Sequence, residues 1–119
     1  MLKLYDYLEG VMEEHNRKQW LFDTKLDHFA SEVMEVLEIN DPLEADLSLQ
    51  RALLACRALQ FPDGNNFKQV YRFNGEQLLV DWRLSPLACY LLIINCSPAN
   101  ELVARAQLFF AMNQKAGVK

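Results

Sequence analysis

Histidine is the residue type best suited to acid–base catalysis at neutral pH, and this chain has two. His28 follows Asp27, but neighbours at i and i+1 on a helix do not face each other, so they are not predicted to exchange a proton. His15 lies far from them in the sequence, at the boundary of an amphipathic stretch. We therefore expect no catalytic role for either histidine.

The three cysteines are odd in number and form no Cys-x-x-Cys pair, so the sequence does not predict a zinc site. Each lies among apolar residues, where a free thiol behaves as a small buried hydrophobe. We predict buried, unpaired thiols, which are typical of a reducing cytoplasm, at Cys56, Cys89 and Cys96.

Motifs that mark common enzyme classes are also missing from the sequence. It has no glycine-rich phosphate loop, no nucleophile elbow and no helical His-Glu metal motif. The carboxylates of the first half fall on the outer faces of predicted helices rather than in convergent pairs. These observations favour a non-enzymatic protein without a metal or cofactor.

Basic side chains suggest contact with DNA. A two-stranded β-ribbon fits the major groove, and phosphate contacts need exposed lysine or arginine. The sequence pI is near 5.1, whereas most nucleic-acid modules are strongly basic, which counts against the hypothesis. The candidate contacts are Lys68, Arg72 and Arg83, on or beside a predicted hairpin, supported by Arg51 and Arg57 on the preceding helix.

The charge of −4 is unevenly distributed along the chain. Residues 1–47 carry 12 acids and 4 bases, whereas residues 48–119 carry 4 acids and 8 bases. Such asymmetry can mark an electrostatic surface for a partner protein, or simply the solvated faces of amphipathic helices. A second hypothesis is therefore a protein-interaction module that uses the acidic helices, and a third use of that surface is a homodimer through the first helix.

Helical periodicity predicts three helices in the first half of the chain. Residues 2–18 carry an apolar stripe of Leu4, Leu8, Val11 and Met12. Thr24 and Asp27 resemble a capping box that opens a second helix, whose buried stripe is Leu26, Phe29, Val33 and Leu37. Asp41 as N-cap and Pro42 at the first position predict a third helix running to about Leu59.

The dipeptide Asn74-Gly75 between two apolar runs predicts a β-hairpin over about residues 68–82. Asn-Gly accepts the positive φ angles of a type I′ turn. Closing the ladder around a two-residue turn pairs Tyr71 with Leu78 and Lys68 with Asp81. One face of the hairpin is then largely apolar, and the opposite face carries Lys68, Val70 and Arg72.

The apolar stretch from residue 84 to 111 predicts two core helices. Asn95, Ser97, Pro98, Asn100 and Glu101 interrupt it, so it does not provide a membrane span. Ser85-Pro86 and Ser97-Pro98 each combine an N-cap with proline at the first helical position. The first helix is apolar nearly all round and therefore central, and Glu101 with Arg105 forms an i,i+4 pair on the second.

The same stretch resembles DNA-damage-inducible protein D and the BRO amino-terminal domain of phage antirepressors. The matching positions are Leu84, Ser85, Ala88, Cys89, Tyr90, Leu91, Asn95, Pro98, Ala104, Ala106, Gln107, Phe110 and Ala111. Residues 26–83 match more diffusely, and Pro86 and Ser97 stand where the family has arginine and aspartate. The resemblance implies an α+β domain of a bacterial or phage regulatory protein that is associated with DNA binding, antirepression or the DNA-damage response.

These interpretations predict one α+β domain over residues 1–119, mostly helical, with a β-hairpin at about 68–82 packed on helices. Residues 1–20, outside the resemblance, form an accessory N-terminal helix. The expected function is a small cytoplasmic regulator that binds DNA, and the alternative is a module that binds a regulatory protein. No leader sequence of the secretory type is recognisable, and no membrane contact is expected.

Overall fold

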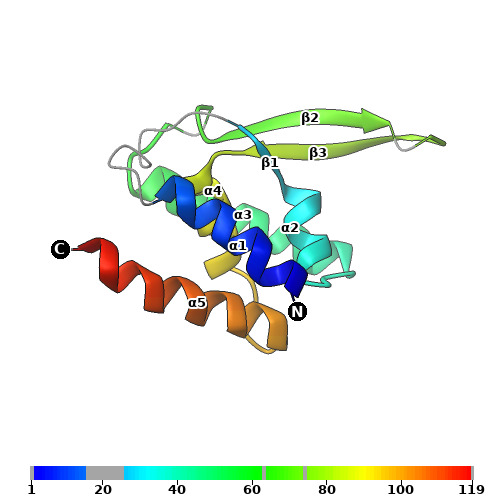
Figure 1. The fold of residues 1–119 in the computed structure, drawn as a ribbon. Coiled ribbons are helices and arrows are strands. Elements are labelled where there is room, and N and C mark those ends of the chain that lie inside the picture. The colour runs from blue at the N-terminus through cyan, green and yellow to red at the C-terminus, as the bar shows by residue number, and fades with distance from the viewer. Residues whose placement is uncertain (1, 16–25, 63, 74, 119) are drawn as a thin grey trace.

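A computed structural model describes residues 2–15, 26–62, 64–73 and 75–118 (Figure 1). A small antiparallel sheet lies on one side of a group of packed helices, and α5 lies on the other side of that group. The elements in chain order are α1 (Leu2–His15), β1 (His28–Phe29), α2 (Ala30–Val36), α3 (Pro42–Ala58), β2 (Phe67–Phe73), β3 (Leu78–Leu84), α4 (Pro86–Ile94) and α5 (Glu101–Val118). This is the predicted α+β architecture, in one domain.

Helix α4 lies at the centre of the core, as its composition predicts. It contacts α1, α2, α3, α5 and β3, so nearly its whole circumference is covered by protein. Leu87, Leu91, Leu92 and Ile93 are all buried. Helix α1 adds Leu4, Leu8 and Val11 to the same core and is therefore an integral part of the domain.

Two of the predicted helix starts are confirmed. The Asp41 carboxylate accepts a hydrogen bond from the Leu43 N–H at the start of α3, and Pro42 follows it. The Ser85 hydroxyl accepts from the Ala88 N–H at the start of α4. Ser85 also donates to the Asn66 side chain at 2.6 Å, so this buried pair ties the start of α4 to the residue before β2.

The predicted start of the last helix was wrong. Ser97 and Pro98 form a turn, and α5 begins only at Glu101. Asn100 caps it instead, since its Oδ1 accepts from the N–H groups of Leu102 and Val103 at 2.8 and 3.3 Å. Asparagine competes well with serine as an N-cap, and its amide also donates to the Leu37 carbonyl at 3.1 Å, a contact that a serine is too short to make. The pair of Glu101 with Arg105 is confirmed.

The start of the second helix was also wrong. Helix α2 begins at Ala30, and the preceding residues His28–Phe29 form strand β1, which pairs with β3. Thr24 lies outside the described residues. Strand pairing at Phe29 competes with helix formation there, and sequence periodicity does not reveal such a distant partner. Val33 and Leu37 are buried as predicted.

The hairpin exists, but its predicted turn and register were wrong. Tyr71 pairs with Val80 and Lys68 with Arg83, a shift of two residues relative to a two-residue turn. The longer connection keeps Gly75 at a positive φ of 97°. Because side chains alternate along a strand, a two-residue shift leaves every side chain on its predicted face. The sheet order is β1-β3-β2, and the hairpin reaches beyond the helices at its tip (Figure 1).

All three cysteines are buried and none of them forms a disulfide, as predicted. Within the described ranges, no helix has the length and apolar composition that crossing a membrane requires.

Candidate nucleic-acid interface

Three of the five predicted DNA-contacting residues lie on one face of the sheet. Lys68 of β2 pairs directly with Arg83 of β3. Arg72 lies further along β2, after Val70, and Lys68, Val70 and Arg72 occupy alternate positions of that strand. Side chains at alternate positions of a strand share a face, and directly paired residues share it too. We call Lys68, Arg72 and Arg83 the basic face.

The ring of Phe29 supports two of these cations. Phe29 pairs with Arg83 across the β1–β3 ladder, so its side chain belongs to the same face. The Cζ of Arg72 lies 3.9 Å from the centroid of the ring, and that of Arg83 lies 5.9 Å from it. Both distances are within the range of a cation–π contact, worth about 0.5–1 kcal/mol at an exposed site.

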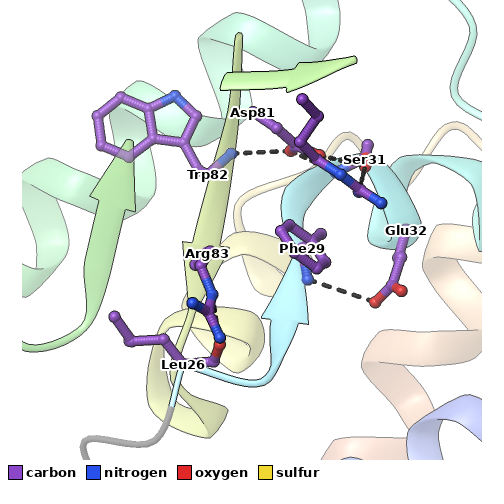
Figure 2. A network of polar contacts seen from close by, with 8 residues as sticks. Leu26, Phe29, Ser31, Glu32, Asp81, Trp82 and Arg83 are labelled. Atoms are coloured by element: carbon purple, nitrogen blue, oxygen red, sulfur yellow. Dashed lines mark hydrogen bonds and ion pairs between the residues drawn. The ribbon is translucent and has the colours of Figure 1, made fainter. Parts of the chain in front are cut away.

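Hydrogen bonds orient both guanidinium groups. Arg72 Nη1 donates to Asp81 Oδ2 at 3.0 Å and to the Ser31 hydroxyl at 3.3 Å. Arg83 Nε donates to the Leu26 carbonyl at 2.9 Å, a contact visible in Figure 2. The Arg72 side chain nevertheless remains 46% exposed, so part of its guanidinium can meet a ligand.

Asp81 is the buried centre of this polar network (Figure 2). Its carboxylate accepts from the Ser31 N–H at 3.1 Å, from the Ser31 hydroxyl at 2.5 Å and from the Trp82 N–H at 2.8 Å, besides the contact with Arg72. Burial raises the pKa of Asp81, but these hydrogen bonds together outweigh it and hold the pKa below its ordinary value. The carboxylate is therefore ionised at neutral pH and fixes Arg72 and the start of α2 to β3.

Sequence reasoning did not find the roles of Phe29, Ser31 and Asp81. Phe29 was predicted in a helix, and Asp81 was predicted opposite Lys68, whereas its ladder partner is Val70. One signal was available in the sequence. Asp81 interrupts the apolar residues Leu78, Leu79, Val80 and Trp82, and a charged residue inside such a strand usually needs a partner when it is buried.

The remaining two predicted bases lie elsewhere. Arg51 and Arg57 are exposed on α3. Arg51 lines a hollow with Asp41, Glu44 and Ser97, to which no residue of the sheet contributes. The structure therefore does not bring them into the basic face.

The side chains of His28 and of the three cysteines pack within the fold. No cluster of three or more His, Cys, Asp or Glu side chains suited to a metal ion occurs in the part of the chain that the structure describes. The His28 ring packs edge-on against Tyr7, with centroids 5.8 Å apart. Burial raises the pKa of the Cys96 thiol, which keeps it in the unreactive protonated form.

No protein-family model, no curated protein and no solved structure matches this chain. The similarity to the BRO-type domain thus stays a prediction based on the residues quoted for it. Several of those residues have packing roles here: Ala88, Cys89, Leu91, Ala106 and Phe110 are buried. Gln107 donates from α5 to the Ile93 and Cys96 carbonyls at the end of α4, at 3.1 Å each. Such residues specify how helices pack rather than what the surface binds.

Proposed function

We propose that this protein is a small cytoplasmic regulator that binds nucleic acid through the basic face of its sheet. The carrying observation is that Lys68, Arg72 and Arg83 share one face, with two guanidinium groups held against a single aromatic ring. The resemblance to BRO and DNA-damage-inducible domains supports duplex DNA as the ligand and regulation as the role.

The arrangement of charges favours an anionic ligand. Lys68 and Arg83 are directly paired across the ladder, and like charges in that position destabilise a sheet. A phosphate that contacts both side chains relieves this repulsion. Preorganisation of the two arginines also favours binding. The hydrogen bonds of Arg72 to Asp81 and of Arg83 to Leu26 restrict both side chains before a ligand binds, which lowers the entropy cost of binding.

The test is fluorescence anisotropy with labelled duplex and single-stranded DNA at two salt concentrations. Neutralising about three phosphates gives a logarithmic salt slope near −2.7, so affinity falls roughly 40-fold between about 50 and 200 mM salt. Lys68→Gln should reduce the slope by about one. The proposal is refuted if the affinity is the same at both salt concentrations, or if no binding is detected at the lower one.

A matched control separates the basic face from total charge. Arg105→Gln removes one positive charge from an exposed side chain on α5 and should leave binding within about twofold of wild type. Equal losses from Lys68→Gln and Arg105→Gln would show that net charge, not this face, governs binding. Arg72→Gln and Arg83→Gln also remove internal hydrogen bonds, so their folding must be checked by circular dichroism first.

The alternative function is capture of a basic regulatory protein by the acidic helices. It is favoured by the exposed acids on α1 and around α2, namely Asp6, Glu9, Glu35 and Glu38. Deleting α1 would also remove Leu4 and Leu8 from the core, so charge reversal is the cleaner experiment. If this alternative holds, the wild-type protein binds a lysine-rich peptide, and the double variant Asp6→Lys, Glu9→Lys does not. Unchanged binding of the peptide by the double variant contradicts the alternative.

A further inference from the structure

The sheet surface opposite the basic face carries exposed apolar side chains that nothing in the described chain covers. Tyr71, Phe73, Leu78 and Val80 alternate with the basic-face positions and are each more than half exposed, at 67, 68, 65 and 55%. We call these four residues the apolar face. A contiguous apolar patch of this kind on a small protein usually marks an interaction site.

A hollow continues the apolar face toward the base of the hairpin. It has a volume of about 320 Å³ and lies between α2, α3 and β3. Met34, Ala45, Leu49 and Trp82 contribute to its wall, and Val80 belongs both to the hollow and to the apolar face. Ser31, Asp46 and Asp81 also line the hollow, so the surface from the tip of the hairpin to the helices is mostly, but not wholly, apolar.

We propose that a second copy of this chain packs on this surface, with the two hairpins face to face and antiparallel about a two-fold axis. In this arrangement the tip of each hairpin lies over the base of the other. The strand rise of about 3.4 Å per residue puts the tip pair, Phe73 and Leu78, roughly 14 Å from the base pair of Gln69 and Trp82. The antiparallel stacking then places the Phe73 ring of one copy against the hollow of the other.

The buried area is sufficient for a weak, specific dimer. Aromatic side chains bury about 150–250 Å² each, so two aromatics at two-thirds exposure with Leu78 and Val80 offer on the order of 400 Å² per copy. Two copies thus contribute roughly 800 Å² from these side chains alone, somewhat below the roughly 1,000 Å² of a stable interface and in the range of a weak, transient one. That size predicts micromolar rather than nanomolar dissociation.

Charge also favours a second copy over nucleic acid at this surface. The four side chains of the apolar face are uncharged, so they offer no attraction to phosphate. Two copies can stack these four side chains on one another with no charge among them, and the two basic faces then lie on the outside of the pair. The dimer does not depend on nucleic-acid binding, and either can fail without the other.

Sedimentation equilibrium of the wild-type chain, without nucleic acid, is the first experiment. Over about 1–200 µM the mass should rise from 13.8 kDa toward twice that value. A mass that stays monomeric throughout overturns the proposal. This measurement needs no variant and so does not depend on how any substitution folds.

Neighbouring leucines on opposite faces provide a matched pair of variants. Leu78 lies on the apolar face and Leu79 on the other, at 65 and 43% exposure. Leu78→Glu should weaken dimerisation at least tenfold, while Leu79→Glu should change it less than twofold. Equal effects, or a stronger effect of Leu79→Glu, would show that the dimer uses another surface and would overturn the proposal.

Discussion

Replacing Asp81 with asparagine tests the polar network that connects the sheet to α2. The substitution keeps the size of the side chain but removes its charge and one of its two acceptor oxygens. The carboxylate accepts two hydrogen bonds from Ser31, one from Arg72 and one from Trp82. At least one of these donors is left without its acceptor in the variant.

The expected loss follows from those contacts. A hydrogen bond to a charged group contributes about 1.5–3 kcal/mol, but contributions within one network are not additive. The Arg72 side chain is half exposed and regains water, so the Ser31 contacts dominate. We expect Asp81→Asn to lower the free energy of unfolding by about 2–4 kcal/mol, a fall in Tm of roughly 8–16 °C for a chain of this size.

The pH dependence provides a second readout. The folded-state pKa of Asp81 is depressed, so its ionisation stabilises the fold in full above the unfolded-state pKa of about 3.9. That contribution is lost as the pH falls through the lower folded-state pKa. The difference between wild type and Asp81→Asn should therefore be constant from about pH 7 to 5 and shrink below pH 4.

Urea unfolding at pH 7, 5 and 3, followed by circular dichroism, measures both effects. Asp27→Asn is the control, since Asp27 is an exposed aspartate just before β1 and its substitution should stay within about 0.5 kcal/mol of wild type. The reasoning is refuted if Asp81→Asn and Asp27→Asn are equally stable at pH 7. It is also refuted if the difference from wild type grows on acidification.

Three further outcomes follow from the structure, each measurable by thermal or urea unfolding. Gln60, just after the end of α3, has a left-handed φ of 64°, which glycine adopts more easily than glutamine. Gln60→Gly should therefore raise the free energy of unfolding by about 0.5–1 kcal/mol. A lower free energy of unfolding in this variant would show that the Gln60 backbone is not strained. Leu92 of α4 is buried, so Leu92→Ala should open a cavity and lower the free energy of unfolding by about 3–4 kcal/mol. Leu108 is exposed, so Leu108→Ala should lower it by less than about 1 kcal/mol. Similar losses from the two variants would refute the central position of α4. Asn100→Ala should cost about 1–2 kcal/mol and Ser97→Ala less than about 0.5, and the reverse order would restore Ser97 as the cap of α5.

Local signals predicted the elements well where the deciding contacts are local. Asp41-Pro42 and Ser85-Pro86 start helices because a short side chain satisfies N–H groups within the next three residues. The Ser97-Pro98 pair has the same local chemistry, but Asn100 rather than Ser97 is the N-cap of α5. The Asn100 side chain also donates to the carbonyl of Leu37, a residue distant in the sequence. Competition of this kind is decided by tertiary contacts, and sequence spacing does not show it.

The candidate site was predicted in part. Lys68 and Arg72 were placed on one face of the hairpin because alternation along a strand is insensitive to a shift of two residues. Their partners were not found, since Phe29 comes from a strand of two residues whose existence depends on pairing with β3. Arg51 and Arg57 were grouped with them by proximity in sequence, but α3 packs on α4 and carries them away from the sheet.

The sequence by itself determined the central helix, the buried thiols, the hairpin and the separation of its apolar and basic faces, because these depend on composition and on residue periodicity. Tertiary structure decided the register of the hairpin, the third strand and the pairing of Arg72 with Asp81. The third strand joins residues far apart in the sequence, such as His28 and Leu84. The strand pairings and the Arg72–Asp81 ion pair stabilise the protein only after folding has brought these residues together, so local sequence patterns do not reveal them.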